Sequence, residues 1–222
     1  MAHAQSLDGP SALPAAGGAP RSLVILLHGY GSNGADLIGL APSWQAALPN
    51  TLFIAPNAPD PCPGAPGGFQ WWGLTSLAPQ ARAAGVRQSA GLVNAFIDDQ
   101  LKRHQLDEAC LALVGFSQGT MVALHIGPRR KHRLAGIVGY SGMLADPEAL
   151  IAEARTKPPV LLIHGDRDPV IPVGVLHEAE ASLRSLEFDA TAHICAGLGH
   201  SIDEMGLRLG EQFLARVLRR QP

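Results

Sequence analysis

The sequence predicts an α/β fold in which helices flank a mainly parallel central sheet, and two observations support this prediction. Continuous apolar runs, the pattern of strands that are buried on both faces, recur along the chain. Between them lie segments in which apolar residues repeat with the period of a helix. Strands that alternate with helices in this way form parallel sheets, because each helix returns the chain to the start of the next strand.

The strands are expected where the apolar runs are strongest. The first central strand lies at 21–29 (RSLVILLHG), and a Gly- and Pro-rich loop at 8–20 separates it from a short edge strand. Further strands are predicted at 51–55, 110–116, 134–140 and 160–165, with a weaker one at 189–195.

The clearest helix is predicted at 81–104, where one face carries Val86, Ala90, Val93, Ile97 and Leu101. Helices are also expected at 118–127, at about 172–186 and at 203–220. In the last of these, an apolar stripe is formed by Leu209, Phe213 and Val217.

The segment 56–79 breaks the alternation, since it is rich in Pro and Gly and contains Phe69, Trp71 and Trp72. Loops of this length in compact domains are usually functional or disordered. A disordered insert would suit the Pro and Gly content. Two adjacent tryptophans are costly to leave in water, however, so we expect an inserted loop that packs beside an active site.

Composition favours one domain that spans residues 1–222. With 46% hydrophobic and only 16% charged residues, the chain can bury a sizeable core. Its formal charge of -2 gives no indication of a nucleic-acid-binding protein. No apolar run approaches the roughly 18 residues of a transmembrane segment.

Cysteine usage and the N-terminal residues indicate the cytoplasm. Cys62, Cys110 and Cys195 show no C-x-x-C spacing and cannot all pair with one another. The first residues contain neither the basic region nor the apolar region of a signal peptide. The oligomeric state is left open, and a homodimer is one arrangement that these features allow.

A G-x-S-x-G motif within 111–121 (LALVGFSQGTM) places Ser117 between a buried strand and a helix. This setting, more than the motif alone, indicates a nucleophile elbow. The flanking Gly115 and Gly119 allow a sharp turn without Cβ clashes. The serine would then be exposed at the carboxyl end of a strand, where the helix N-terminus favours developing negative charge.

A serine hydroxyl needs a general base, and the base needs an acid that orients it. The strand at 160–165 is followed by Asp166 and Asp168. Asp168 is favoured as the acid because it lies farther past the strand and because the PVIP sequence that follows stiffens its loop. Asp166 is expected to form a local Asx turn, and Asp203 to cap the final helix.

His200 is favoured as the base, since it follows the strand at 189–195 and completes the order Ser, Asp, His that is known for such triads. Its loop leaves the same sheet edge as Ser117. His28 and His164 lie at strand ends, where a buried structural histidine is more common, and His193 lies within a strand.

An oxyanion hole requires preorganised donors for the tetrahedral intermediate. One donor is expected to be the backbone N–H of Gln118, directly after the nucleophile. The other is expected to be the N–H of Tyr30 in the loop HGYGSNG, where Gly29 and Gly31 permit a tight turn. Turn formation alone would also explain these glycines.

Several blocks of the sequence resemble, in the same order, those of the phospholipase/carboxylesterase family of α/β-hydrolases, which includes carboxylesterases and acyl-protein thioesterases. The blocks are LLHGYGSNGADL, APNAP, GFSQG, HGDRDPVIP and GLGHS, and the match runs from about residue 23 to the C-terminus. The resemblance implies an α/β-hydrolase fold with little or no cap domain, and it supports the triad and the two backbone donors. It also implies that the substrate pocket is lined by Trp72, Met143, Val170 and Leu198.

We therefore expect a serine carboxylesterase that hydrolyses short- to medium-chain esters through an acyl-enzyme. No cofactor is expected, because the chain shows neither the spacing of a zinc site nor a phosphate-binding G-x-x-x-x-G-K motif. The nearest alternatives are an acyl thioesterase or a lysophospholipase with the same triad. An alternative of another class is a non-catalytic protein that binds a small apolar ligand.

Overall fold

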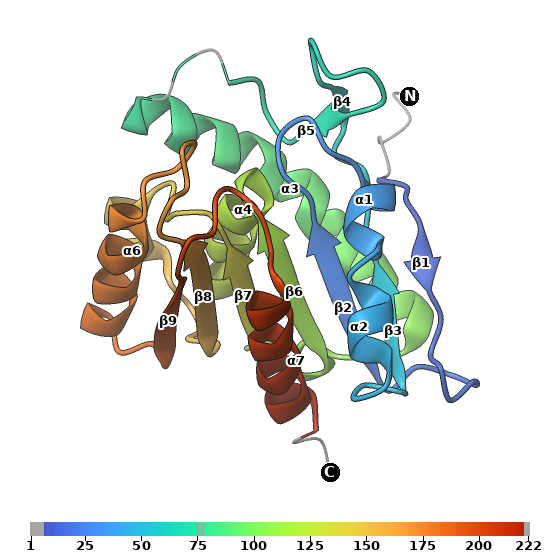
Figure 1. The fold of residues 1–222 in the computed structure, drawn as a ribbon. Helices are drawn as coiled ribbons and strands as arrows, with labels where there is room; N and C mark the ends of the chain where they lie inside the picture. Colours follow the sequence, from blue (N-terminus) through green and yellow to red (C-terminus); the bar gives the residue numbers. More distant parts are fainter. Residues whose placement is uncertain (1–6, 75, 77, 220–222) are drawn as a thin grey trace, which may run out of the picture.

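The computed structural model describes residues 7–74, 76 and 78–219, and its main element is a seven-stranded sheet (Figure 1). The strand order is β1-β3-β2-β6-β7-β8-β9. These strands are β1 (Ser11–Ala12), β2 (Ser22–Leu27), β3 (Thr51–Ile54), β6 (Leu111–Phe116), β7 (Gly136–Tyr140), β8 (Val160–Gly165) and β9 (Ala190–Cys195). Apart from the pairing of β1 with β3, the neighbouring strands run parallel, so the predicted sheet is confirmed.

Helices cover both faces of the sheet. They are α1 (Gly34–Ile38), α2 (Ala41–Gln45), α3 (Pro79–His104), α4 (Gln118–Ile126), α5 (Pro147–Glu153), α6 (Gly174–Ser185) and α7 (Glu204–Leu218). Short 3-10 turns lie at Glu108–Cys110 and Gly127–Arg129. In Figure 1, α1, α2 and α7 lie on one face, and α3, α4 and α6 on the other. Within the described residues, no helix has the length and apolar character that a membrane crossing would need.

The predicted helices are found within two residues of their expected bounds, although residue 220 lies outside the described residues. The helices α1, α2 and α5 were not predicted, because five to seven residues are too few to show a helical period. The strand that gave the weakest signal, β9, lies at the edge of the sheet and is only partly buried.

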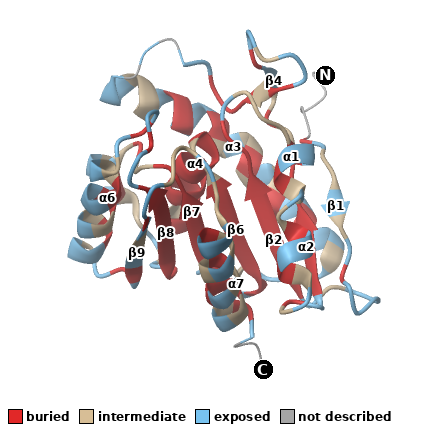
Figure 2. Cartoon of the chain, viewed as in Figure 1, coloured by how far each residue is buried: buried red, intermediate tan, exposed pale blue. Residues whose placement is uncertain are grey.

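The strand side chains alternate between two apolar cores, one on each face of the sheet (Figure 2). In β2, Leu23 and Ile25 belong to one core, whereas Val24 and Leu26 belong to the other. Every residue of β2, β3, β7 and β8 is buried, which explains the continuous apolar runs of the sequence. Because the strands are packed on both faces, the positions of their carboxyl ends are well defined, and the candidate site lies at these ends.

In the loop after β3, the part that carries the two tryptophans is packed against the protein, whereas most of the hairpin turn before it is exposed. It contains a short hairpin, β4 (Asp60–Pro61) and β5 (Phe69–Gln70), followed by Trp71 and Trp72, which are 1% and 4% exposed. The Trp71 indole N–H donates to the carbonyl of His28, and the Trp72 ring packs so closely on Gly85 of α3 that a Cβ there would overlap it. The burial of both tryptophans agrees with a loop that packs on the protein. Residues 75 and 77 of the predicted segment 56–79 lie outside the described residues.

Candidate active site

Ser117 occupies a sharp turn between β6 and α4. Its backbone has φ 52° and ψ -113°, a conformation that is rare for a residue with a side chain. The flanking glycines are required by close contacts, because a Cβ on Gly119 would overlap the carbonyl of Leu27 and one on Gly115 would overlap the start of α4. The turn is held in place by the Ser117 N–H, which donates to the Tyr140 carbonyl at 2.9 Å. Strain of this kind is typical of a nucleophile elbow.

Asp168 and His200 lie in the loops that follow β8 and β9, and they are directly hydrogen-bonded. The distance between Asp168 Oδ2 and His200 Nδ1 is 2.7 Å. The other carboxylate oxygen, Oδ1, accepts from the backbone N–H groups of Val170 and Ile171, both at 2.8 Å. Burial raises the pKa of Asp168, but the hydrogen bonds from Ile171, His200 and Val170 together outweigh it and lower the pKa below its ordinary value. The carboxylate is therefore stabilised in its ionised form.

The two other candidate acids contact backbone groups. Asp203 caps α7 by accepting from the N–H of Gly206 at 2.7 Å, as expected. Asp166 differs from the expectation of a local Asx turn, because it accepts from the N–H of Gly197 in the loop after β9. Asp166 thus joins the loop after β8 to the loop after β9, and His200 Nδ1 is bonded to Asp168 instead.

His200 lies beside the elbow. Its ring centroid is 4.9 Å from that of Phe116, the residue before Ser117. Among the described residues, the hydrogen bonds do not include one between the Ser117 hydroxyl and His200. The Asp168 contact occupies Nδ1 of His200, which leaves Nε2 as the nitrogen that can exchange a proton with a neighbouring group.

The other strand-end histidines are buried and hydrogen-bonded, as the sequence indicated. His28 Nδ1 lies 2.8 Å from the Gly29 carbonyl, and His28 Nε2 accepts from the N–H of Ala58 at 2.9 Å. Burial lowers the pKa of His28, so the neutral ring is favoured. His164 is buried beneath the Asp168 loop. His193 lies in β9 and is half-buried.

The predicted oxyanion donors both lie next to the elbow. Within the described part of the chain, the backbone N–H groups of Tyr30 and Gln118 donate no hydrogen bond. A Cβ on Gly29 would lie 3.3 Å from Ser117 Cβ, so the Tyr30 loop passes close to the serine. Gly31 has φ 77°, and its N–H donates to the Phe69 carbonyl at 2.9 Å, which fixes the turn. Two unpaired N–H groups beside the serine are the arrangement that a developing oxyanion requires.

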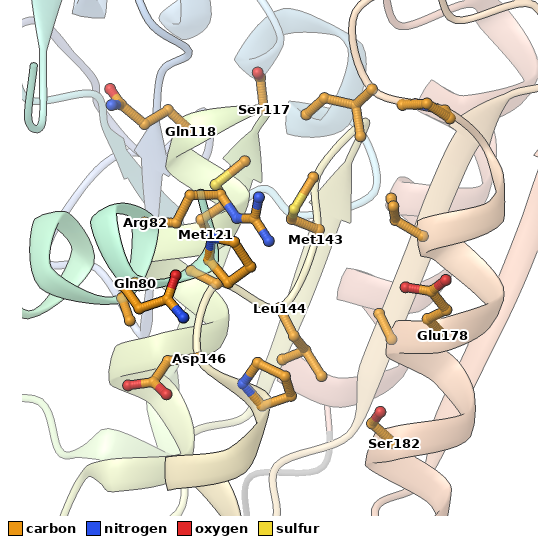
Figure 3. A pocket seen from close by; sticks show the side chains of 18 of the residues that line it. Gln80, Arg82, Ser117, Gln118, Met121, Met143, Leu144, Asp146, Glu178 and Ser182 are labelled. Carbon is orange, nitrogen blue, oxygen red and sulfur yellow. The ribbon is translucent and has the colours of Figure 1, made fainter. Parts of the chain in front are cut away.

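A cavity of about 800 Å³ opens at Ser117 and extends between α3 and α6 (Figure 3). Its apolar lining includes Leu74, Met121, Met143, Leu144, Ala145, Val170, Ile171, Val175 and Ala179. Its charged lining consists of Arg82, Asp146, Glu148 and Glu178. Ser117 lies at one end in Figure 3, and Asp146 and Ser182 lie at the other.

Two of the four expected pocket residues line this cavity, namely Met143 and Val170, and two do not. Trp72 is buried against α3, with its carbonyl bonded to the Gln118 side chain. Leu198 packs against the core on the opposite face of the sheet. Trp72 is therefore kept from the cavity by its packing against α3, and the partly buried Leu198 by its packing on the other face of the sheet.

Sequence reasoning assigned a role only to the backbone of Gln118, but the structure also gives one to its side chain. The side-chain oxygen accepts from the N–H of Trp71, and the side-chain nitrogen donates to the carbonyl of Trp72, both at 2.9 Å. No sequence signal marks this contact, since the partners are more than forty residues apart. Within the described residues, no group of three or more His, Cys, Asp or Glu could hold a metal.

The chain is similar to a known protein family, to several curated proteins and to solved structures. The phospholipase/carboxylesterase family model matches residues 11–218. Acyl-protein thioesterase 1 of Schizosaccharomyces pombe is 32% identical over 206 residues, which cover 88% of this chain and 90% of that protein. Esterase YpfH of Escherichia coli is 29% identical and covers 85% of this chain and 79% of its own length. The crystal structure of esterase PE8 is 46% identical, covers 96% of this chain and 100% of its own, and superposes with a TM-score of 0.91.

Proposed function

The chain belongs to the phospholipase/carboxylesterase family and is an ester hydrolase, and from that premise we propose that it hydrolyses short- to medium-chain carboxylic esters through an acyl-enzyme on Ser117. The observation that carries the proposal is the hydrogen bond of 2.7 Å between Asp168 and His200 beside the strained elbow. A protein that only binds a ligand has no need of an oriented imidazole next to a serine.

In the first half of the reaction, the Ser117 hydroxyl attacks the ester carbonyl and His200 Nε2 takes its proton. Hydrogen bonds of this kind are often long before the transition state and shorten in it. The oxyanion that forms accepts from the backbone N–H groups of Tyr30 and Gln118. Asp168 stabilises the imidazolium. The intermediate then collapses, and His200 donates the proton to the departing alcohol.

In the second half, water replaces the alcohol. His200 removes a proton from the water as it attacks the acyl-serine, and the same donors hold the second oxyanion. Collapse of this intermediate returns the proton to Ser117 and releases the carboxylic acid. The residues complete the cycle unchanged, and every proton passes through His200.

The lining of the cavity supports the proposed chain length. Met121 and Met143 lie near Ser117 and offer a flexible apolar surface to an acyl chain. Farther away the cavity meets charged groups, which include Asp146 and Glu178. A methyl end that reached these groups would displace their water at a cost in free energy. Chains that stop within the apolar part avoid this cost.

Acyl thioester hydrolysis is a second candidate, because the Schizosaccharomyces pombe relative bears the name of an acyl-protein thioesterase. The same triad would serve, with a thiolate as the leaving group in place of an alkoxide. A lysophospholipase would use the same acyl chemistry, and it requires in addition a place for a phosphate headgroup.

The cytoplasm remains the proposed compartment. Cys62 and Cys195 are buried thiols that form no disulfide among the described residues. Unpaired thiols persist in reducing compartments, which supports the proposal.

Labelling with a fluorophosphonate tests the proposal directly. We expect one adduct, located on Ser117 by mass spectrometry and absent from Ser117→Ala. A folded protein that is not labelled would point to a ligand-binding protein instead. Turnover of p-nitrophenyl esters and matched acyl thioesters from two to sixteen carbons then separates the candidates, with the highest kcat/KM expected for short and medium esters.

A further inference from the structure

His164 is a buried side chain that the reaction scheme does not use. It lies in β8, four residues before Asp168, and both side chains are fully buried. Its Nε2 lies 2.8 Å from the carbonyl of Ile171 and 3.2 Å from Asp168 Oδ2. Because a carbonyl can only accept, the proton of the imidazole must be on Nε2, and the same N–H also faces the carboxylate.

The Asp168 carboxylate accepts three hydrogen bonds, and His164 lies beside it as a fourth polar neighbour. The N–H groups of Val170 and Ile171 face Oδ1, and His200 and His164 face Oδ2. Ile171 takes part twice, since its N–H donates to Asp168 and its carbonyl accepts from His164. The three residues therefore form a closed ring of two hydrogen bonds and one contact of 3.2 Å between His164 Nε2 and Asp168 Oδ2, and a rotation of the carboxylate would disrupt this ring.

A role in core packing alone explains this histidine poorly. His164 Nδ1 is buried and has no hydrogen-bond partner within the described part of the chain, which costs stability. An apolar side chain at this position would avoid that cost. His28, at the corresponding end of β2, has a partner for each ring nitrogen. What the His164 imidazole supplies, and an apolar side chain cannot, is an Nε2–H that is hydrogen-bonded to the Ile171 carbonyl and also lies beside Asp168 Oδ2.

We propose that His164 is a positioning residue that holds the Asp168 carboxylate in the orientation in which Oδ2 accepts from His200. This inference rests on the proposed function, because it assigns a role within the same site. The N–H of His164 also draws electron density from Oδ2. Without it the carboxylate becomes a stronger acceptor, so the acid limb of the pH–rate profile is expected to move to higher pH.

Few other ionisable groups face this part of the site. Among the described residues, the ionisable side chains in contact with the Asp168 carboxylate are His164 and His200. Asp166 binds the N–H of Gly197, and Asp203 contacts Cys195 and caps α7. On α6, Glu178 lines the same cavity as Ile171. These acids are unchanged by a substitution at His164, so a shift in pH dependence reports on the His164 contact.

Three substitutions separate positioning from packing. His164→Gln offers an amide N–H near the place of Nε2, whereas the shorter side chain of His164→Asn does not reach it and His164→Leu has no donor. We expect the His164→Leu and His164→Asn variants to lower kcat about tenfold with little change in KM. In both variants, the acid limb of the kcat/KM profile should also move up by about half a pH unit. Gln is expected to restore most of the kcat and the wild-type pH profile.

His125→Leu is the matched control, since it removes a buried histidine of α4 that the triad does not contact. The proposal is overturned if Leu and Asn only lower the melting temperature, or if Gln loses as much kcat as Asn does. Should the Leu variant not fold, Asn and Gln carry the comparison. Fluorophosphonate labelling of Ser117 in the wild-type protein is measured in parallel. If the wild type is not labelled, the proposed function itself has failed, and not only the role of His164.

Discussion

The side-chain oxygen of Gln118 accepts a hydrogen bond from the backbone N–H of Trp71 at 2.9 Å, which ties the elbow to the loop after β3. The side-chain nitrogen donates to the carbonyl of Trp72 at the same distance. Trp71 in turn donates from its indole to the carbonyl of His28, two residues before the second oxyanion donor. The two proposed donors are thus connected through one buried residue of the loop, so its packing bears on catalysis.

Replacing Gln118 by Met removes both side-chain hydrogen bonds but keeps the backbone N–H of residue 118. We expect kcat to fall about tenfold, because the Tyr30 donor is no longer held against the elbow. The loss of pairing for two buried backbone groups should also lower the free energy of unfolding by about 2–4 kcal/mol. Steady-state kinetics and urea unfolding measure the two effects.

Gln70→Met provides the matched control in the same loop. Gln70 is buried, and its amide donates to the carbonyl of Pro61 within the β4–β5 hairpin. This variant should lose stability and keep its kcat. Equal losses of kcat in the two variants would show that any weakening of the loop is enough, and that the Gln118 contact has no special role.

Acyl-chain preference should depend on Met143, which lines the cavity. Met143→Trp fills part of the apolar passage next to Ser117, so kcat/KM for an octanoate ester should fall about tenfold relative to that for an acetate ester. Trp72→Phe serves as the comparison, because Trp72 is buried away from the cavity. It should leave the octanoate-to-acetate ratio unchanged, and a larger change in that variant than in Met143→Trp would contradict the assignment.

The parts of the fold and site that depend on local chain geometry were predictable from the sequence. Gly115, Ser117 and Gly119 stand between a strand pattern and a helix pattern. The contact that requires Gly115 arises within the turn itself, whereas the one that requires Gly119 is with Leu27 of the distant strand β2. The strands were predictable as well, since their two-sided burial produces continuous apolar runs. Asp168 and His200 were favoured because parallel strands place their following loops at one edge.

Features that depend on packing between distant segments were not predictable. Whether Trp72 faces the cavity or α3 is decided by Gly85, which leaves space for the ring and lies in a different element. Leu198 follows β9, and no periodicity in a loop indicates which face of the sheet its side chain meets. The role of the Gln118 side chain arises from a contact with the tryptophan loop. Each of these features depends on contacts between segments far apart in the sequence, so only the three-dimensional structure reveals it.

The identity of the acid is tested by paired substitutions. Asp168→Asn replaces the oxygen that accepts from His200 or forces the ring into the wrong tautomer, so kcat should fall about 10³- to 10⁴-fold. Asp166→Asn keeps an oxygen that can accept from the N–H of Gly197 and should change kcat by no more than about threefold. Rates with a p-nitrophenyl ester, on variants with wild-type circular dichroism, decide the ranking. The opposite ranking would assign the role to Asp166.

Stability at mildly acidic pH should be limited by His125. This histidine of α4 is 7% exposed. Burial, together with the positive charges of Arg129 and Arg87, lowers its pKa to about 4 against the opposing effect of Asp146 and Glu153. Between its ordinary pKa of 6.5 and that value, the unfolded chain binds a proton that the folded chain does not. The free energy of unfolding therefore falls as the pH falls through this window, and it is unaffected by His125 above it.

For a shift of this size, lowering the pH from 7.5 to 5.0 should cost the wild type about 2 kcal/mol more than His125→Leu, which cannot bind the proton. Urea unfolding at the two pH values measures the difference. His132→Gln is the control, because His132 is exposed and its loss should leave the pH dependence unchanged. If His125→Leu and the wild type lose the same free energy, His125 is protonated as readily in the folded protein as in the unfolded chain, and the acid sensitivity comes from other groups.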